Sequence, residues 1–173
     1  MFSLIQSFDD FVLQTLAASR IDVLTDVLSV VSFLGEWYVL LPAAAIIVLV
    51  LARSGLVVQA TEFAYAVIGT SIAVAAIKFL IDRPRPPESF RIAAESGYSF
   101  PSWHAAAAIA FWGYLAFLAA KRVRNPALRV AIIVLCLVII ITTVYSRLYL
   151  GAHYFSDVVM GALLGGLVLL IAL

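Results

Sequence analysis

The sequence predicts an all-α protein built as a polytopic bundle of transmembrane helices, with five spans and an amphipathic N-terminal segment. Hydrophobic residues make up 65% of its 173 residues and charged residues only 12%, against a charged share of about 25% in soluble domains. Five long apolar runs approach the ~20 residues that a helix needs to cross the hydrocarbon layer, and they do not alternate as barrel strands do. We therefore expect a single membrane-embedded domain over residues 1–173.

Charges interrupt the N-terminal segment, residues 1–34, which predicts one or two amphipathic helices. The stretch Asp22–Leu34 is too short to cross the bilayer comfortably, so we expect it to lie in the membrane interface, with a sixth span as the alternative. The five predicted spans that follow are Trp37–Ala52, Leu56–Ile81, Trp103–Ala120, Leu128–Tyr145 and Phe155–Leu173.

Two connections, 82–102 and 146–154, follow the second and fourth spans and therefore lie on the same side of the membrane. The other side receives basic residues with no acidic residue among them, and the positive-inside rule assigns that side to the cytoplasm. These basic residues are Arg53, Lys121, Arg122, Arg124 and Arg129. The two connections, which hold or border both histidines of the chain, are thus expected to face the periplasm or another extracytoplasmic space.

Charge and cysteine content narrow the classes of partner. The formal net charge of +1 gives no electrostatic footprint for nucleic acid, so membrane lipids are the expected surroundings. Cys136 is the lone cysteine and lies in an apolar run, so this chain offers neither a disulfide nor a thiolate metal site. The sequence does not specify an oligomeric state.

Two cations flank the start of the first connection. Lys78 precedes Arg85 by seven positions, which places both on one helical face if the helix persists. Pro84 and Pro86 stiffen the chain around Arg85. An arginine fork and a lysine point charge together suit phosphate oxygens. The alternative for Lys78 is that it only snorkels to the interface.

The third predicted span begins at a helix start suited to an anion. Ser102 is placed as its N-cap, and the free N–H groups of the first turn would attract negative charge. Capping by Ser102 and interfacial anchoring by Trp103 explain these two residues without any ligand. His104 is left without such an explanation.

The second connection carries a histidine followed four residues later by an acid. On a helix, the Asp157 carboxylate could accept from one imidazole nitrogen of His153 and leave the other nitrogen free as a base or nucleophile. A carboxylate at the top of a span needs a partner. A structural pair with no chemical role is the alternative.

These residues fall into three separated blocks. They read Lys78-Phe-Leu-Ile-Asp-Arg-Pro-Arg85-Pro86, then Pro101-Ser102-Trp103-His104, then Ser146-Arg147 continuing through His153 to Asp157. The chain therefore resembles the type 2 phosphatidic acid phosphatase superfamily of integral membrane lipid phosphatases. That family's pattern is Lys, six residues, Arg-Pro; Pro-Ser-Gly-His; and Ser-Arg, five residues, His, three residues, Asp. Three blocks in one order are more specific than a single short motif.

The resemblance implies a role for each matching residue. His153 would attack phosphorus and form a phosphohistidine, with Asp157 holding its tautomer, while His104 would protonate the leaving oxygen. The implied phosphate-binding groups are Lys78, Arg85, Ser102 and Arg147. Trp103 stands where the family has glycine, so its indole is expected in the substrate pocket, where it can narrow the space or contact the lipid.

Residues that match no fixed position of the family pattern have simpler interpretations. The charges of the first connection, Arg83, Glu88, Arg91 and Glu95, are expected to be solvated or to contact lipid head groups. Gly161 and Gly165, spaced four apart in the last span, predict close helix packing.

The implied activity is that of a metal-independent enzyme without a cofactor that hydrolyses a lipid phosphomonoester or diphosphate. The expected substrates are undecaprenyl diphosphate first, then phosphatidylglycerol phosphate or phosphatidic acid. A lipid A phosphatase would use the same groups and is one alternative. A non-enzymatic transporter or proton-relay protein is another, but its polar groups would be spread through the depth of the spans, whereas these gather at one end.

Overall fold

The computed structural model describes residues 2–92 and 95–173, and every regular element in this part is helical. The elements in chain order are α1 (Phe2–Ala18), α2 (Asp22–Leu34), α3 (Trp37–Arg53), α4 (Val57–Ile81), the short 3₁₀ turn η1 (Glu88–Phe90), α5 (Trp103–Arg122), α6 (Pro126–Tyr149) and α7 (Phe155–Ala172). The predicted all-α class is therefore confirmed.

The predicted spans correspond closely to helices. Within the described residues, four helices (α4 to α7) are long and apolar enough to cross a membrane, and α2 and α3 qualify together as a fifth span bent by 49°. The sixth span is not among them. One predicted boundary is wrong: α6 continues to Tyr149, so Ser146 and Arg147 lie on its last turns and not in a loop.

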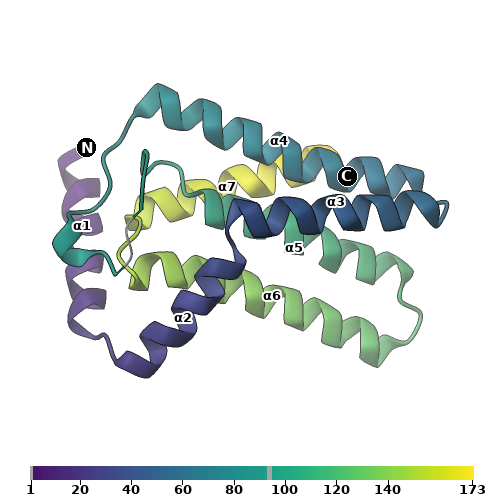
Figure 1. Cartoon of the computed structure of the whole chain (residues 1–173), viewed down its shortest axis with the longest axis horizontal. Coiled ribbons are helices and arrows are strands. Elements are labelled where there is room, and N and C mark those ends of the chain that lie inside the picture. The colour runs from purple at the N-terminus through teal and green to yellow at the C-terminus, as the bar shows by residue number, and fades with distance from the viewer. Residues whose placement is uncertain (1, 93–94) are drawn as a thin grey trace.

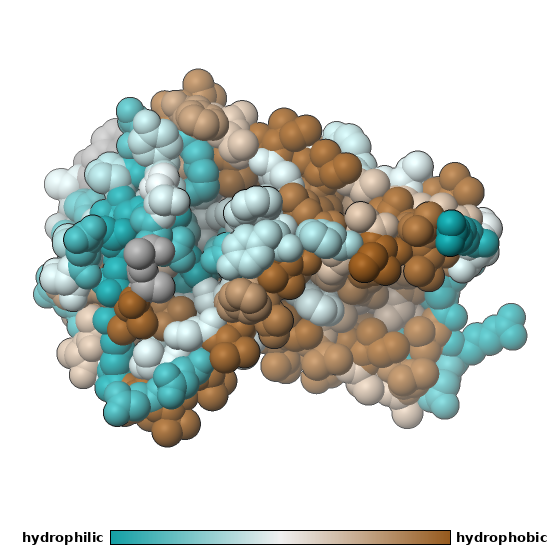
Figure 2. Space-filling model, viewed as in Figure 1, coloured by the Kyte–Doolittle hydropathy of each residue, from teal (hydrophilic) through white to brown (hydrophobic). Residues whose placement is uncertain are grey.

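Helix α5 forms the centre of the bundle and packs against α4, α6 and α7 (Figure 1). Its small side chains allow this, because Ala105 to Ala108 and Ala110 are all buried. Large apolar side chains instead point outward over the body of the bundle, which is mostly brown in Figure 2. This distribution suits a lipid environment, in which every spanning backbone must be helical.

Helix α7 approaches α5 backbone to backbone at two glycines. A Cβ atom added to Gly161 would lie 2.4 Å from the Ser102 carbonyl oxygen, and one added to Gly165 would lie 2.3 Å from that of Ala106. Any side chain at these positions would force the helices apart. The close packing predicted for this glycine pair is confirmed.

Helix α1 lies across one end of the bundle (Figure 1). Its apolar side faces outward, with Leu4 and Phe11 exposed, whereas Asp9 on the opposite side is 1% exposed. This is the arrangement expected of an amphipathic helix whose apolar face meets lipid.

The helix connections divide between the two ends of the bundle (Figure 1). The α4–α5 and α6–α7 connections lie at the end crossed by α1, and the α3–α4 and α5–α6 connections lie at the other end. The basic residues Arg53, Lys121 and Arg122 end α3 and α5 at this second end. The chain is thus a multi-pass membrane protein with its histidines and its basic cluster at opposite ends.

Candidate active site

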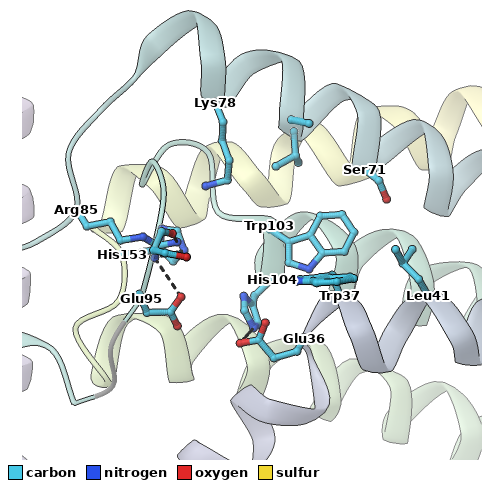
Figure 3. Close-up of a pocket in the computed structure, with 13 residues that line it drawn as sticks. Glu36, Trp37, Leu41, Ser71, Lys78, Arg85, Glu95, Trp103, His104 and His153 are labelled. Atoms are coloured by element: carbon cyan, nitrogen blue, oxygen red, sulfur yellow. Dashed lines mark hydrogen bonds and ion pairs between the residues drawn. The ribbon is translucent and has the colours of Figure 1, made fainter.

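A pocket of about 380 Å³ opens beside α3, α4 and the start of α5, near the end of the bundle that α1 crosses (Figure 3). Five of the eight predicted site residues line it: Lys78, Arg85, Trp103, His104 and His153. Its deeper wall is apolar and comes from α3 and α4. A polar mouth joined to an apolar wall fits a molecule with a charged head and a hydrocarbon tail.

Lys78 and Arg85 both reach the mouth of the pocket, but not along one helical face as predicted. Helix α4 ends at Ile81, where Asp82 takes a left-handed conformation with φ 43°. Beyond it the chain runs extended, because the prolines that flank Arg85 exclude helix. Lys78 donates to the carbonyl of Tyr98, and Figure 3 shows its ammonium group pointing into the pocket toward Arg85 and His153.

The Arg85 guanidinium is fixed by backbone carbonyls. It donates to Gly97 at 3.1 Å, to Ser96 at 3.0 Å and to Ala152 at 3.0 Å. Burial lowers the pKa of Arg85, although an arginine remains charged at neutral pH. Its cation is therefore held in the pocket before any anion arrives.

His153 lies in the connection before α7, where a glycine turn positions it. Gly151 has φ 70°, and a Cβ atom there would lie 2.1 Å from the carbonyl oxygen of Phe90. The Nε2 atom of His153 lies 3.4 Å from Nη1 of Arg85. Because arginine is only a donor, this contact favours a lone pair on Nε2 and the proton on Nδ1. Burial lowers the pKa of His153 to about 3, which keeps the ring neutral at physiological pH.

Asp157 lies on the Nδ1 side of the ring, and the predicted i, i+4 helical pairing is corrected by the structure. Helix α7 begins at Phe155, so His153 precedes the helix. The distance from Nδ1 to Asp157 Oδ2 is 3.6 Å. Ser99 closes the gap, because its hydroxyl donates to Asp157 Oδ2 at 2.5 Å and lies 3.3 Å from Nδ1. Asp157 also accepts from the Tyr154 N–H at 2.9 Å.

His104, the second histidine, is 4% exposed on the first turn of α5. Its Nε2 atom lies 3.4 Å from the carboxylate of Glu36, which ends the bend between α2 and α3. Figure 3 shows the two side chains facing each other at the floor of the pocket.

Ser102 and Arg147 do not line this pocket. Ser102 is fully buried as the N-cap of α5 and accepts from the Ala105 N–H at 3.5 Å. Arg147 lines a neighbouring cavity of about 180 Å³. Glu95 separates the two spaces, since its carboxylate bonds Arg147 and lies 3.5 Å from Arg85. An acid thus bridges two of the predicted phosphate ligands.

Two of the charges that we expected to be solvated are paired at this site. Arg83 forms ion pairs of 2.6 Å with Asp157 and 2.8 Å with Asp9, and Glu95 bridges Arg85 and Arg147. Glu88 is exposed as expected, whereas Arg91, which pairs with it at 3.2 Å, is largely buried and also donates to the Glu95 carbonyl. The prediction of solvated charges failed because a loop, unlike a helix, has no regular spacing from which the partners of a charged residue can be predicted.

Three further residues at the site were missed by sequence reasoning: Asp9, Glu36 and Ser99. Asp9 and Glu36 belong to the N-terminal part of the chain, which carries no motif. Ser99 lies two residues before the Pro-Ser-Trp-His block, so its place beside that block was the only available signal.

Within residues 2–92 and 95–173, no group of three or more His, Cys, Asp or Glu side chains is arranged to hold a metal ion. The cations that line the pocket are Lys78 and Arg85.

The helical bundle and this pocket define a multi-pass membrane protein in which two histidines and two cations line one pocket. The family model of the PAP2 superfamily matches residues 59–173, and the chain belongs to this family. It is 30% identical over 139 residues to an uncharacterized 22.5 kDa protein in the cps region of Klebsiella pneumoniae. That match covers 78% of this chain and 62% of the relative, less than two thirds of its length.

Two solved structures share the fold. The crystal structure of the first transmembrane PAP2 type phosphatidylglycerolphosphate phosphatase from Bacillus subtilis is 25% identical, with a TM-score of 0.87, and the match covers 98% of this chain and 84% of that chain. Aquifex aeolicus LpxE is 22% identical, with a TM-score of 0.74 and coverage of 92% and 91%. The second likeness shows the fold alone.

Proposed function

We propose that the protein is a membrane lipid phosphatase that uses His153 as its nucleophile. One observation carries the proposal: the Nε2 atom of a neutral, buried imidazole faces a pocket lined by Lys78, Arg85 and His104, while Nδ1 faces a carboxylate. The membership in the PAP2 superfamily and the likeness to a phosphatidylglycerolphosphate phosphatase support the same chemistry.

In the first step, the Nε2 lone pair of His153 attacks phosphorus and the bond from phosphorus to the lipid oxygen breaks. His104 donates a proton to that oxygen, so the alcohol or lipid monophosphate leaves with its leaving oxygen protonated. The ring of His153 becomes positively charged, and Asp157 stabilises it through Nδ1–H. Lys78 and Arg85 stabilise the charge on the transferring phosphoryl oxygens, which supplies most of the rate enhancement in such reactions.

In the second step, water attacks the phosphohistidine. His104, now neutral, accepts the proton of that water, and the bond between phosphorus and Nε2 breaks to release inorganic phosphate. Both histidines return to their starting forms. No metal takes part in this scheme, because the fixed cations hold the phosphate.

We further propose that the site faces the extracytoplasmic side. The basic cluster at the far end of the bundle supports this orientation by the positive-inside rule. The apolar wall of the pocket, formed by residues such as Leu41 and Val74, would contact the hydrocarbon next to the head group. Undecaprenyl diphosphate is the first candidate, followed by phosphatidylglycerol phosphate and phosphatidic acid. Lipid A phosphate remains the alternative within the enzyme class.

The test is phosphate release by the purified protein in detergent with excess chelator. The panel contains undecaprenyl diphosphate, phosphatidylglycerol phosphate, phosphatidic acid and lipid A, and heat-inactivated protein serves as the blank. Chelator-resistant release from at least one lipid supports the proposal, and the order of kcat/KM values identifies the substrate. Release from none of them contradicts it.

Replacing His104 separates its proton from the rest of the chemistry. We expect His104→Ala to lower kcat by roughly 10²-fold or more on a lipid phosphate, whose alkoxide leaves poorly, and by much less on an aryl phosphate, whose leaving oxygen needs no proton. Initial rates on both substrates measure the difference. Equal losses on the two substrates would remove the general-acid role.

Glu95 competes with the substrate for two arginines. We expect Glu95→Gln to lower KM for the lipid phosphate by about 5-fold, because the amide leaves Arg85 and Arg147 free for phosphate oxygens without changing the shape of the loop. Steady-state kinetics measure KM, and Glu88→Gln, an exposed acid of the same connection, is the matched control. An unchanged or raised KM would show that Glu95 does not occupy the phosphate site.

A further inference from the structure

We propose that Asp9 on helix α1 is a positioning residue of the active site, acting through Arg83 on Asp157 and His153. The inference rests on the proposed function and extends it to a part of the chain that precedes the residues matched by the family model, 59–173. Helix α1 would then be a component of the catalytic apparatus as well as a membrane-surface helix.

The Asp9 carboxylate is buried against the first turn of α7. It accepts from the backbone N–H of Ser156 at 2.8 Å and from the Ser156 hydroxyl at 2.5 Å. It also pairs with Arg83 at 2.8 Å. With 1% exposure, Asp9 is desolvated, and such a carboxylate is stable only where donors and a cation surround it.

Arg83 connects the two acids through different nitrogens. Its Nη2 atom donates to Asp9, and its Nη1 atom donates to Asp157 at 2.6 Å and to Ser156 at 2.7 Å. The Tyr154 ring lies under the guanidinium, 4.4 Å from its centre. A planar fork held at one end and stacked on a ring has little freedom at its other end.

The chain of contacts therefore ends at the nucleophile. Arg83 holds Asp157 Oδ1, Ser99 and the Tyr154 N–H hold Oδ2, and that oxygen faces Nδ1 of His153. If Asp9 loses its charge, Arg83 has a single acid left to balance it and can draw closer to Asp157. The carboxylate then becomes a poorer partner for the imidazolium that forms during phosphoryl transfer.

The deciding variant is Asp9→Asn, which keeps the size and one acceptor oxygen for Ser156 but removes the charge that faces Arg83. Asp10→Asn is the matched control, because Asp10 lies on the same helix but does not bond Arg83 itself: among the described residues it accepts only from Gln6, whose Oε1 atom accepts from Arg83 at 2.9 Å. We expect Asp9→Asn to lower kcat by about 10-fold with KM within about 2-fold, since Asp9 touches no phosphate ligand. Asp10→Asn should match the wild type.

Arg83→Lys tests whether the effect passes through the guanidinium. The double variant Asp9→Asn, Arg83→Lys should lower kcat no further than the more damaging of the two single changes. In the double variant Asp10→Asn, Arg83→Lys, the two effects on kcat should multiply. Ser156→Ala gives a second, milder disturbance of the same contacts if Asp9→Asn folds poorly, with kcat lowered by about 3-fold. Multiplicative effects for Asp9 and Arg83, or equal kcat values for the Asp9 and Asp10 variants, would overturn the proposal.

A spectroscopic readout separates this proposal from the proposed function. His104→Asn leaves His153 as the only histidine of the chain, so its ring nitrogens give an unambiguous ¹⁵N spectrum. In that background, Asp9→Asn should shift the Nδ1 resonance and Asp10→Asn should not, whether or not any lipid is hydrolysed. A wild-type protein that releases no phosphate contradicts the function, and an unshifted Nδ1 resonance contradicts the role of Asp9.

Discussion

His153→Ala is expected to abolish phosphate release, with kcat lowered by roughly 10⁴-fold or more. The methyl group leaves no nucleophile at the position of Nε2, and the other histidine of the pocket, His104 on α5, faces Glu36 instead. Because the wild-type ring is buried and neutral, its loss adds no unpaired charge near Arg85. Initial rates of phosphate release, with thermal unfolding as the measure of folding, check the result.

The intermediate provides a second readout for the same variant. Short incubation with ³²P-labelled substrate should leave an acid-labile label on the wild type and none on His153→Ala. His104→Ala, which retains the nucleophile, should still take up label from an aryl phosphate. A folded His153→Ala protein that turns over at the wild-type rate would refute the nucleophile assignment.

Asp157→Asn is expected to lower kcat by roughly 10³-fold and also to lower the unfolding temperature. Both oxygens of the wild-type carboxylate accept from donors: Oδ1 from Arg83, and Oδ2 from Ser99 and from the Tyr154 N–H. An amide must present its NH₂ group to one of these sets, so at least one buried donor loses its acceptor. The His153 tautomer loses its partner at the same time.

Asp82→Asn is the matched control for Asp157→Asn. Asp82 is an exposed acid at the same end of the bundle, and it is the residue in the left-handed conformation that caps the end of α4. Its amide variant should keep kcat and the unfolding temperature close to wild-type values. If Asp157→Asn behaves like Asp82→Asn, Asp157 has no part in orienting the nucleophile.

Much of this architecture follows from local sequence properties. Apolar runs of sufficient length predict helices, because a backbone in lipid can satisfy its hydrogen bonds only within itself. The spacing of Gly161 and Gly165 predicts a close helix contact. The Lys78 to Pro86 block and the Pro101 to His104 block lie at the end of one helix and the start of the next, so adjacency in sequence already brings them together.

Other features depend on contacts between distant segments. The sequence gives no sign that Arg83 differs from other loop charges. Its partner Asp9 lies on α1 and comes within 2.8 Å of it only in the folded chain. Glu95 is likewise paired with a residue that is distant in sequence, because its partner Arg147 lies 52 residues later. The i, i+4 spacing of His153 and Asp157 correctly predicts that the two side chains lie close together, but it predicts a helix as the cause. A glycine turn and the Ser99 hydroxyl set their geometry instead.

The glycine contacts between α5 and α7 fix the spacing of two side chains of the candidate site. His104 on α5 and Asp157 on α7 are held by helices whose backbones touch, so neither helix can slide without a steric clash. The apolar wall comes from α3 and α4, and α3 packs mainly on α4. Under the proposed function, the space for the lipid tail can therefore change at wall residues such as Leu41 and Val74 while the α5–α7 contact stays as it is.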